Sequence, residues 1–97
     1  MNVPKNTFIN ITLVDDKEIK KLNKKYKKKD STTDVLSFPI NEKLPDGRFY
    51  LGDIIVNLDQ AKRQMKEFGN KDYRHEVSEL VGHGVLHLLG VHHKEDE

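Results

Sequence analysis

The segment LGDIIVNL, residues 51–58, decides the fold. It is a short and mostly apolar run that contains branched residues, and such a run is typical of a strand at the centre of a sheet. Asp59 follows at once and is a candidate N-cap for a helix that runs to Phe68, where Gly69 and Asn70 end it. The segment therefore predicts a central strand followed directly by a helix.

The residues before this segment predict one more strand and one more helix. The stretch Phe8–Val14 (FINITLV) alternates and is rich in branched residues, which favours a strand. A helix is predicted over 16–26, after the acidic pair at 15 and 16. Its buried face is expected to carry Ile19, Leu22 and Tyr26, which recur at helical spacing, while lysines cover its outer face.

A hairpin and a last helix complete the predicted fold. Val35–Phe38 (VLSF) predicts a short strand that Pro39 ends, and a Pro-Asp-Gly turn precedes the central strand. The last helix begins after Asp72 and ends near Gly90. The predicted fold class is α/β (α+β), with a small three-stranded sheet packed against about three helices in a single domain over residues 1–97.

Composition excludes several classes of protein. The 97 residues are 35% apolar and 34% charged, which leaves a modest core that a bound metal or a partner could strengthen. The absence of Cys excludes disulfide partners, thiolate metal sites and cysteine nucleophiles. No apolar run is long enough to span a membrane, and the N-terminus has no hydrophobic signal core. We therefore expect a cytoplasmic protein with no membrane partner.

The last long helix carries the chemistry. His83 and His87 stand four residues apart and share a helix face. Gly90 is placed to turn the chain back so that His93 approaches the same point. Three imidazoles leave a fourth coordination position open, which is the pattern of a catalytic zinc site at the end of this helix. The apolar residues around this part of the helix predict buried imidazoles, which need partners and find them in a metal.

A second class of metal hydrolase has the same histidine spacing. Metzincin-type proteases need a glutamate directly after the first histidine as general base, and here that residue is Gly84. Glu76 and Glu79 stand one to two turns earlier, where each either accepts a hydrogen bond from a ligand imidazole or is simply solvated or salt-bridged. The solvated or salt-bridged arrangement is the commoner one for such residues. The protease interpretation is therefore disfavoured.

Four ordered motifs resemble those of one known family. The stretch 83–93, HGVLHLLGVHH, resembles the His-Gly-x-Leu-His-Leu-x-Gly-Tyr-Asp-His signature of the YbeY family, which comprises bacterial metal-dependent endoribonucleases that act in ribosomal RNA maturation. Residues 22–26, 33–39 and 51–54 are similar to three further motifs of that family, in the same order. The resemblance extends from about Ile9 to His93.

The resemblance implies a specific activity and site. It implies a zinc-dependent, single-strand-specific endoribonuclease that processes the 3′ end of 16S rRNA and serves ribosome quality control. The implied partners are single-stranded rRNA and the small ribosomal subunit. One Zn²⁺ per chain would be held by His83, His87 and His93, with His83 also in a catalytic role. Lys27 occupies the position of a functional arginine in the family and is the second catalytic candidate.

The chain also departs from the family pattern. Lys27 keeps the charge of that arginine but cannot form the bidentate hydrogen bonds that a guanidinium group makes to phosphate. Val91 and His92 replace Tyr-Asp, so His92 is a rival ligand, although the spacing favours His93. Family members are longer at both ends, so we expect a short version that lacks the usual flanks. These departures leave open an alternative function, a catalytically weak ribosome-associated maturation factor that keeps the fold and the metal.

A lysine-rich stretch on the first predicted helix and its exit loop is the candidate RNA contact. The first half of the chain, residues 1–50, has a net charge of +4, whereas residues 51–97 have a net charge of −3. Clustered lysines are typical of a nucleic-acid-binding surface, although such helices are often merely solvated. The predicted RNA-binding residues are Lys24, Lys27, Lys28 and Lys29.

Overall fold

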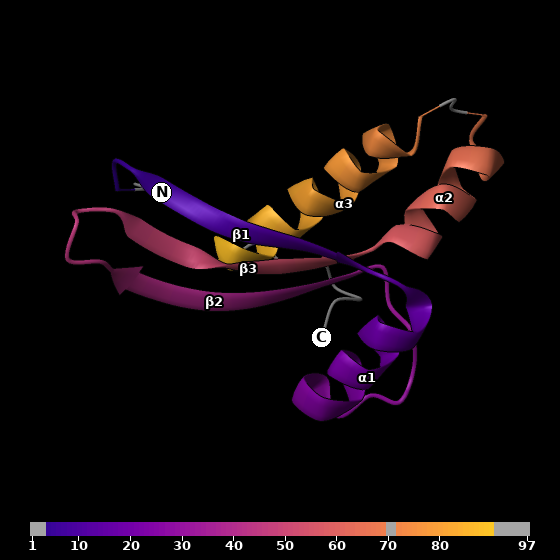
Figure 1. Cartoon of the computed structure of the whole chain (residues 1–97), viewed down its shortest axis with the longest axis horizontal. Helices are drawn as coiled ribbons and strands as arrows, with labels where there is room; N and C mark the ends of the chain where they lie inside the picture. Colours follow the sequence, from indigo (N-terminus) through magenta and orange to yellow (C-terminus); the bar gives the residue numbers. More distant parts are fainter. Residues whose placement is uncertain (1–3, 70–71, 91–97) are drawn as a thin grey trace.

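A computed structural model describes residues 4–69 and 72–90 of the chain (Figure 1). The elements in chain order are β1 (Thr7–Val14), α1 (Asp16–Lys27), β2 (Val35–Lys43), β3 (Phe49–Asn57), α2 (Leu58–Glu67) and α3 (Tyr73–Leu88). This is the α+β fold that the sequence predicts, with a three-stranded sheet and three helices. No helix in the described ranges has both the length and the apolar character needed to cross a bilayer.

The sheet is mixed, and β3 is its central strand, as predicted. The strand order is β1-β3-β2, with β1 parallel and β2 antiparallel to β3. Ile54 and Val56 of β3 are completely buried on one face of the sheet and Ile55 is half-buried on the other, which explains the nearly continuous apolar run of this strand. The hairpin of β2 and β3 is confirmed, because Val35 pairs with Val56 and Lys43 pairs with Phe49.

The prediction that Pro39 ends its strand is wrong. Strand β2 continues through Pro39 to Lys43, and the register shifts between Pro39 and Glu42. Proline lacks a backbone N–H, but β2 is an edge strand, and an edge strand tolerates this loss where one side of the backbone needs no ladder partner.

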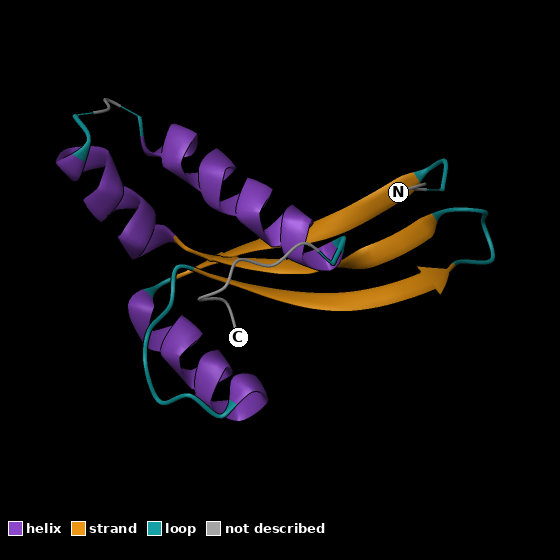
Figure 2. Ribbon diagram, turned by 180° about the vertical axis from the view of Figure 1, so that it is seen from behind, coloured by secondary structure: helices purple, strands orange, loops and turns teal. Residues whose placement is uncertain are grey.

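Helices cover both faces of the sheet. Ser37 of β2 donates a hydrogen bond to the backbone of α3, whereas the ring of its neighbour Phe38 packs edge-on against Tyr26 of α1. Successive side chains of a strand point to opposite faces, so α3 and α1 lie on opposite sides of the sheet, as Figures 1 and 2 show. The main core lies on the α3 side and consists of Leu51, Ile54, Val56, Ala61, Leu80 and Leu88.

The N-cap residue is the predicted one for two of the three helices. Asp15 caps α1 and Asp72 caps α3, each through a carboxylate oxygen that accepts a backbone N–H. For α2 the prediction of Asp59 as N-cap is wrong, because β3 runs directly into the helix and Asn57 takes the cap position. The carboxylate of Asp59 instead accepts the backbone N–H of Asp16, 3.0 Å away.

The buried face of α1 also differs from the prediction. Ile19 is completely buried and Leu22 is half-buried, but Tyr26 is exposed, and the second buried residue is Asn23. The side-chain amide of Asn23 donates to the backbone oxygen of Ser31 at 3.0 Å. Asn23 is therefore a polar anchor for the loop that follows α1, which apolar periodicity alone does not reveal.

A polar cluster joins the N-terminal ends of α1 and α2. The guanidinium of Arg63 donates to both carboxylate oxygens of Asp16 at 2.8 and 2.9 Å, and Asn57 donates to the same carboxylate at 2.7 Å. These hydrogen bonds, that of Arg63 first, lower the pKa of Asp16 from 3.8 to about 2. The cluster fixes the start of α1 relative to the helix pair α2–α3.

Candidate functional site

Helix α3 places His83 and His87 on one side, one turn apart. His83 is exposed and His87 is half-buried. The helix ends at Leu88, and Gly90 adopts a φ of +88°, which agrees with the predicted left-handed turn. His92 and His93 lie outside the described residues.

Gly84 sets how closely this part of α3 approaches the sheet. A Cβ atom at this position would lie 2.8 Å from Cγ2 of Ile54 and 3.0 Å from Oγ of Ser37. The same Oγ donates to the backbone oxygen of Gly84 at 3.1 Å. The helix therefore touches the sheet at residue 84, and the histidines at 83 and 87 lie to one side of that contact. A glutamate at residue 84 would face the sheet, which is a structural argument against the protease interpretation.

The prediction that the two imidazoles are buried among apolar side chains is wrong. The buried residues of α3 are Glu76, Leu80, Gly84 and Leu88, which repeat every four residues and face inward. Leu86 is 41% exposed, so the apolar residues near the histidines do not enclose them. Instead, each imidazole lies at the edge of a separate pocket.

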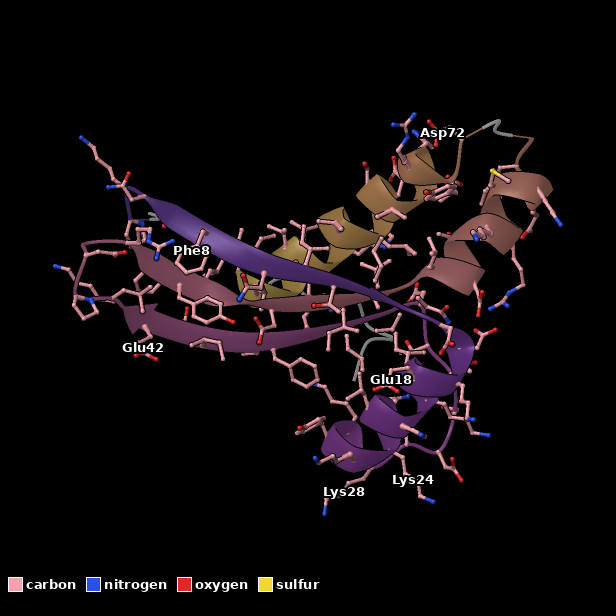
Figure 3. The ribbon with its side chains drawn as sticks, viewed as in Figure 1. Phe8, Glu18, Lys24, Lys28, Glu42 and Asp72 are labelled. Atoms are coloured by element: carbon pink, nitrogen blue, oxygen red, sulfur yellow. The ribbon has the colours of Figure 1, made fainter. Side chains whose placement is uncertain are left out.

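The first pocket, here called the basic pocket, has a volume of about 800 Å³ and lies between the α1–β2 loop and α3. Its lining includes His87 together with Lys27, Lys28 and Lys29. The structure thus brings three of the four predicted RNA-binding lysines to the pocket of one predicted metal ligand. Lys24 does not line this pocket, and its ammonium group lies 3.9 Å from the carboxylate of Asp30. Figure 3 shows Lys24 and Lys28 near the C-terminal end of α1.

Two buried asparagines hold the loop that forms this pocket. Asn23 binds the backbone oxygen of Ser31, and Asn57 donates to the backbone oxygen of Thr33 at 3.1 Å. The backbone N–H of Asn57 also donates to the backbone oxygen of Asp34 at 2.8 Å. Sequence analysis missed both asparagines, because their hydrogen-bond partners become neighbours only in the folded chain.

The second pocket, here called the acidic pocket, has a volume of about 490 Å³ and lies between α2 and α3. Its lining includes His83, Glu76 and Glu79. Glu76 is only 4% exposed and is therefore not solvated. The side chain of Glu79 is 63% exposed and its Oε1 lies 3.8 Å from Nε2 of His75, as expected for a solvated or salt-bridged residue. Asp34 lines both pockets and therefore lies between the two histidine-bearing sites.

Comparison with known proteins identifies the family. The family model described as Endoribonuclease YbeY matches residues 1–97. The chain belongs to the YbeY family. The endoribonuclease YbeY of Persephonella marina is 50% identical over 93 residues, which cover 95% of this chain and 60% of that protein. The corresponding protein of Aquifex aeolicus is 44% identical over 90 residues, which cover 93% of this chain and 59% of the relative.

A solved structure supports the fold of this YbeY-family chain. The solution structure of TM1509 from Thermotoga maritima matches with a TM-score of 0.55 and 37% sequence identity. The match covers 89% of this chain and 53% of TM1509. The chain spans about 60% of the length of the two YbeY relatives named above.

The donor groups of this YbeY-family chain fit a metal ion. Two histidines one helical turn apart on the same side of a helix have the spacing of a chelating pair, and imidazole is a preferred zinc ligand. Within residues 4–69 and 72–90, no three His, Asp or Glu side chains are arranged to hold a metal. His83 and His87 would therefore share a metal with a donor beyond these ranges, and the predicted third ligand, His93, is one such residue.

Proposed function

We propose that this chain is a metal-dependent endoribonuclease that cleaves single-stranded RNA, with ribosomal RNA of the small subunit as its substrate. One observation carries the proposal: His87, one of the two histidines of the α3 pair, lines the same pocket as Lys27, Lys28 and Lys29. Membership of the YbeY family, whose matched relatives are named endoribonucleases, supports the same reaction. A cytoplasmic location, processing of the 3′ end of 16S rRNA and a part in ribosome quality control belong to this proposal.

The metal-binding residues in this proposal are His83, His87 and His93. A bound Zn²⁺ would supply a Lewis acid that neutralises phosphate charge and makes water a nucleophile near neutral pH. The two described imidazoles would act as neutral nitrogen ligands, and their position at the pocket edges leaves them accessible to a metal from solvent.

The lysines of the basic pocket would hold the RNA backbone. The ammonium group of Lys27 lies 5.3 Å from the ring centre of Phe38, a cation–π contact that fixes it beside the sheet. Lys28 and Lys29 add two more positive charges to the same pocket. Because phosphate contacts release counterions, RNA binding is expected to weaken steeply as salt concentration rises.

Asp34 would position the substrate between the two histidines. Asp34 lines both pockets, and a carboxylate is an acceptor for hydrogen bonds from a ribose hydroxyl or from a water molecule. Thr33 Oγ1 lies 3.4 Å from the same carboxylate, and the backbone of Asp34 is held by Asn57. The residue is therefore set in place before any substrate binds.

An RNA cleavage assay tests this function. Labelled single-stranded RNA is incubated with the zinc-loaded protein, with and without chelator, and with the variants His83→Ala and Lys27→Ala. We expect chelation and His83→Ala to abolish cleavage, and Lys27→Ala to lower it at least tenfold. The matched control is Lys17→Ala, since Lys17 is also an exposed lysine of α1 but does not line the basic pocket. Cleavage that survives chelation would contradict the proposal.

A second candidate function is favoured by one residue. Lys27 stands where the YbeY motif has arginine, and lysine offers a point charge instead of a planar, bidentate grip on phosphate. The alternative is a maturation factor that binds ribosomal RNA and metal but cleaves poorly. Lys27→Arg distinguishes the two. A large gain in cleavage, with little change in RNA affinity, supports the weak-enzyme alternative.

A further inference from the structure

The acidic pocket has an aromatic wall that the proposed reaction does not use. Phe68, the C-cap residue of α2, is 64% exposed and lines this pocket beside His83. Leu80 of α3 is buried and contributes an apolar surface to the same pocket. A volume of about 490 Å³ is in the range of pockets that hold small organic groups. A flat ring above an apolar floor is a surface on which a planar group stacks.

The charges of the pocket restrict what enters it. Three carboxylates, those of Asp34, Glu76 and Glu79, and two imidazoles, those of His75 and His83, belong to residues that line it, and none of its described lining residues is Lys or Arg. A phosphate group is therefore held less well here than in the basic pocket with its three lysines. The carboxylates in the described ranges are also not arranged in a group that could hold a metal ion. A planar group whose N–H donors face carboxylate and amide oxygens suits this lining.

The position of Asp34 links the two pockets. Since Asp34 lines both, an RNA strand whose phosphates lie among Lys27, Lys28 and Lys29 has its neighbouring base within reach of the acidic pocket. A nucleobase matches the pocket, because it is uncharged and planar and carries polar groups on its edge. Stacking on aromatic side chains is a general way in which proteins hold unpaired bases.

We propose that the acidic pocket is a subsite for one unpaired, amino-bearing nucleobase, which stacks on Phe68 and donates its exocyclic amino group to Glu79. The side chain of Glu79 is 63% exposed, and its Oε1 lies 3.8 Å from Nε2 of His75, so the second carboxylate oxygen is the acceptor for the amino group. The half-buried Gln64 lines the same pocket and provides a second polar contact. Adenine, cytosine and guanine carry such an amino group, whereas uracil does not. The inference rests on the proposed function in that RNA occupies the basic pocket.

Binding of three short RNAs tests this subsite. Each is a labelled hexamer of uridines in which one internal position is adenosine, purine riboside or uridine, so that the first two differ by a single amino group. Affinity is measured by fluorescence anisotropy with the zinc-loaded protein, and the length of the RNA is checked on a denaturing gel. We expect adenosine to bind about fivefold more tightly than purine riboside, and purine riboside more tightly than uridine.

Two variants and two matched controls assign the preference to the pocket. Phe68→Leu is expected to weaken binding of the adenosine hexamer about tenfold, which is the scale of one base–aromatic stack. Glu79→Gln is expected to remove the difference between adenosine and purine riboside. Phe8→Leu and Glu42→Gln make the same changes elsewhere, at the end of the sheet where Figure 3 labels both residues, and should leave the preference unchanged.

The outcomes separate this inference from the proposed nuclease activity. Equal affinities for the three hexamers, no binding of any of them, or equal effects of Phe68→Leu and Phe8→Leu would overturn the subsite. A base preference without RNA cleavage supports the subsite and overturns the nuclease. Cleavage without base preference supports the nuclease and overturns the subsite.

Discussion

Helix α3 carries two rows of residues, here called the inward and the outward stripe, that are offset by one position in the sequence and differ in their surroundings. The inward stripe repeats every four residues and contains Glu76, Leu80, Gly84 and Leu88, all buried. The outward stripe contains Glu79, His83 and His87, which line the two pockets. Because 3.6 residues make one turn, an offset of one residue turns a side chain about 100° around the helix. Glu76 and Leu80 of the inward stripe also line the acidic pocket, but neither histidine belongs to that stripe. Substitutions at the histidines and at the packed residues should therefore have separable effects.

Metal removal is expected to change the stability of the protein most. It acts through the outward stripe, because His83 and His87 are the proposed metal ligands. Binding of zinc to the folded state stabilises it by about 4 kcal/mol when free zinc exceeds Kd a thousandfold. Chelation should therefore lower the Tm of the wild-type protein, which differential scanning calorimetry measures. His83→Ala should show a low Tm with and without zinc. An unchanged Tm on chelation would show that metal is not linked to folding.

The next largest effect is expected from a leucine pair on the same helix. Leu80 is 2% exposed, and Leu80→Ala should lower the free energy of unfolding by about 3 kcal/mol, because it leaves a cavity in the core. Leu86 is 41% exposed, and Leu86→Ala should cost less than about 1 kcal/mol. Urea unfolding of both variants measures the difference. Equal losses would argue against the assignment of the inward stripe.

A glycine pair sharpens the comparison further. Gly84→Ala adds a Cβ 2.8 Å from Ile54 and should destabilise the fold by about 1–2 kcal/mol, even though alanine favours helix. Gly82→Ala, two residues earlier, meets no atom within 4 Å and should stabilise the fold by up to about 1 kcal/mol. Urea unfolding again provides the measurement. A loss of unfolding free energy for Gly84→Ala together with a gain for Gly82→Ala supports the contact at residue 84. A gain for both substitutions would refute it.

The smallest effect is expected outside both stripes, at the polar cluster of Asp16. Arg63→Met should lower stability at pH 7 by less than Leu80→Ala or Gly84→Ala does, since the ion pair is partly exposed. Folding depresses the pKa of Asp16 to about 2, so the contribution of this carboxylate is complete above about pH 4 and is lost as pH falls through about 2. The stability difference between wild type and variant should shrink from pH 5 to pH 2. A constant difference would contradict this assignment.

Local patterns in the sequence predicted the elements that depend on local interactions. The apolar run at 51–58 indicated the central strand, and Asp15 and Asp72 indicated two helix starts, because a cap needs only neighbouring residues. The i, i+4 spacing correctly placed His83 and His87 on one side of α3. The motifs of the chain were also sufficient to identify its family.

Features that depend on distant contacts were missed. Glu76 was expected to be solvent-exposed but is buried, and Tyr26 was expected to be buried but is exposed. Which face of a helix is covered depends on elements elsewhere in the chain. Strand β2 passes Pro39 because it lies at the sheet edge, which becomes evident only from the strand order. The position of Asp34 between two pockets depends on Asn57, whose partners are about 24 residues away. The predicted role of His93 stays a prediction, since the residue lies outside the described ranges.

The dependence of RNA cleavage on zinc occupancy tests the central claim most directly. Zinc-free protein is titrated with Zn²⁺, bound metal is measured by mass spectrometry of the native protein, and the initial cleavage rate of labelled single-stranded RNA is recorded at each step. The account predicts that the rate rises in proportion to bound zinc and reaches its plateau at one ion per chain. A rate in zinc-free protein that equals the rate at full occupancy would contradict it.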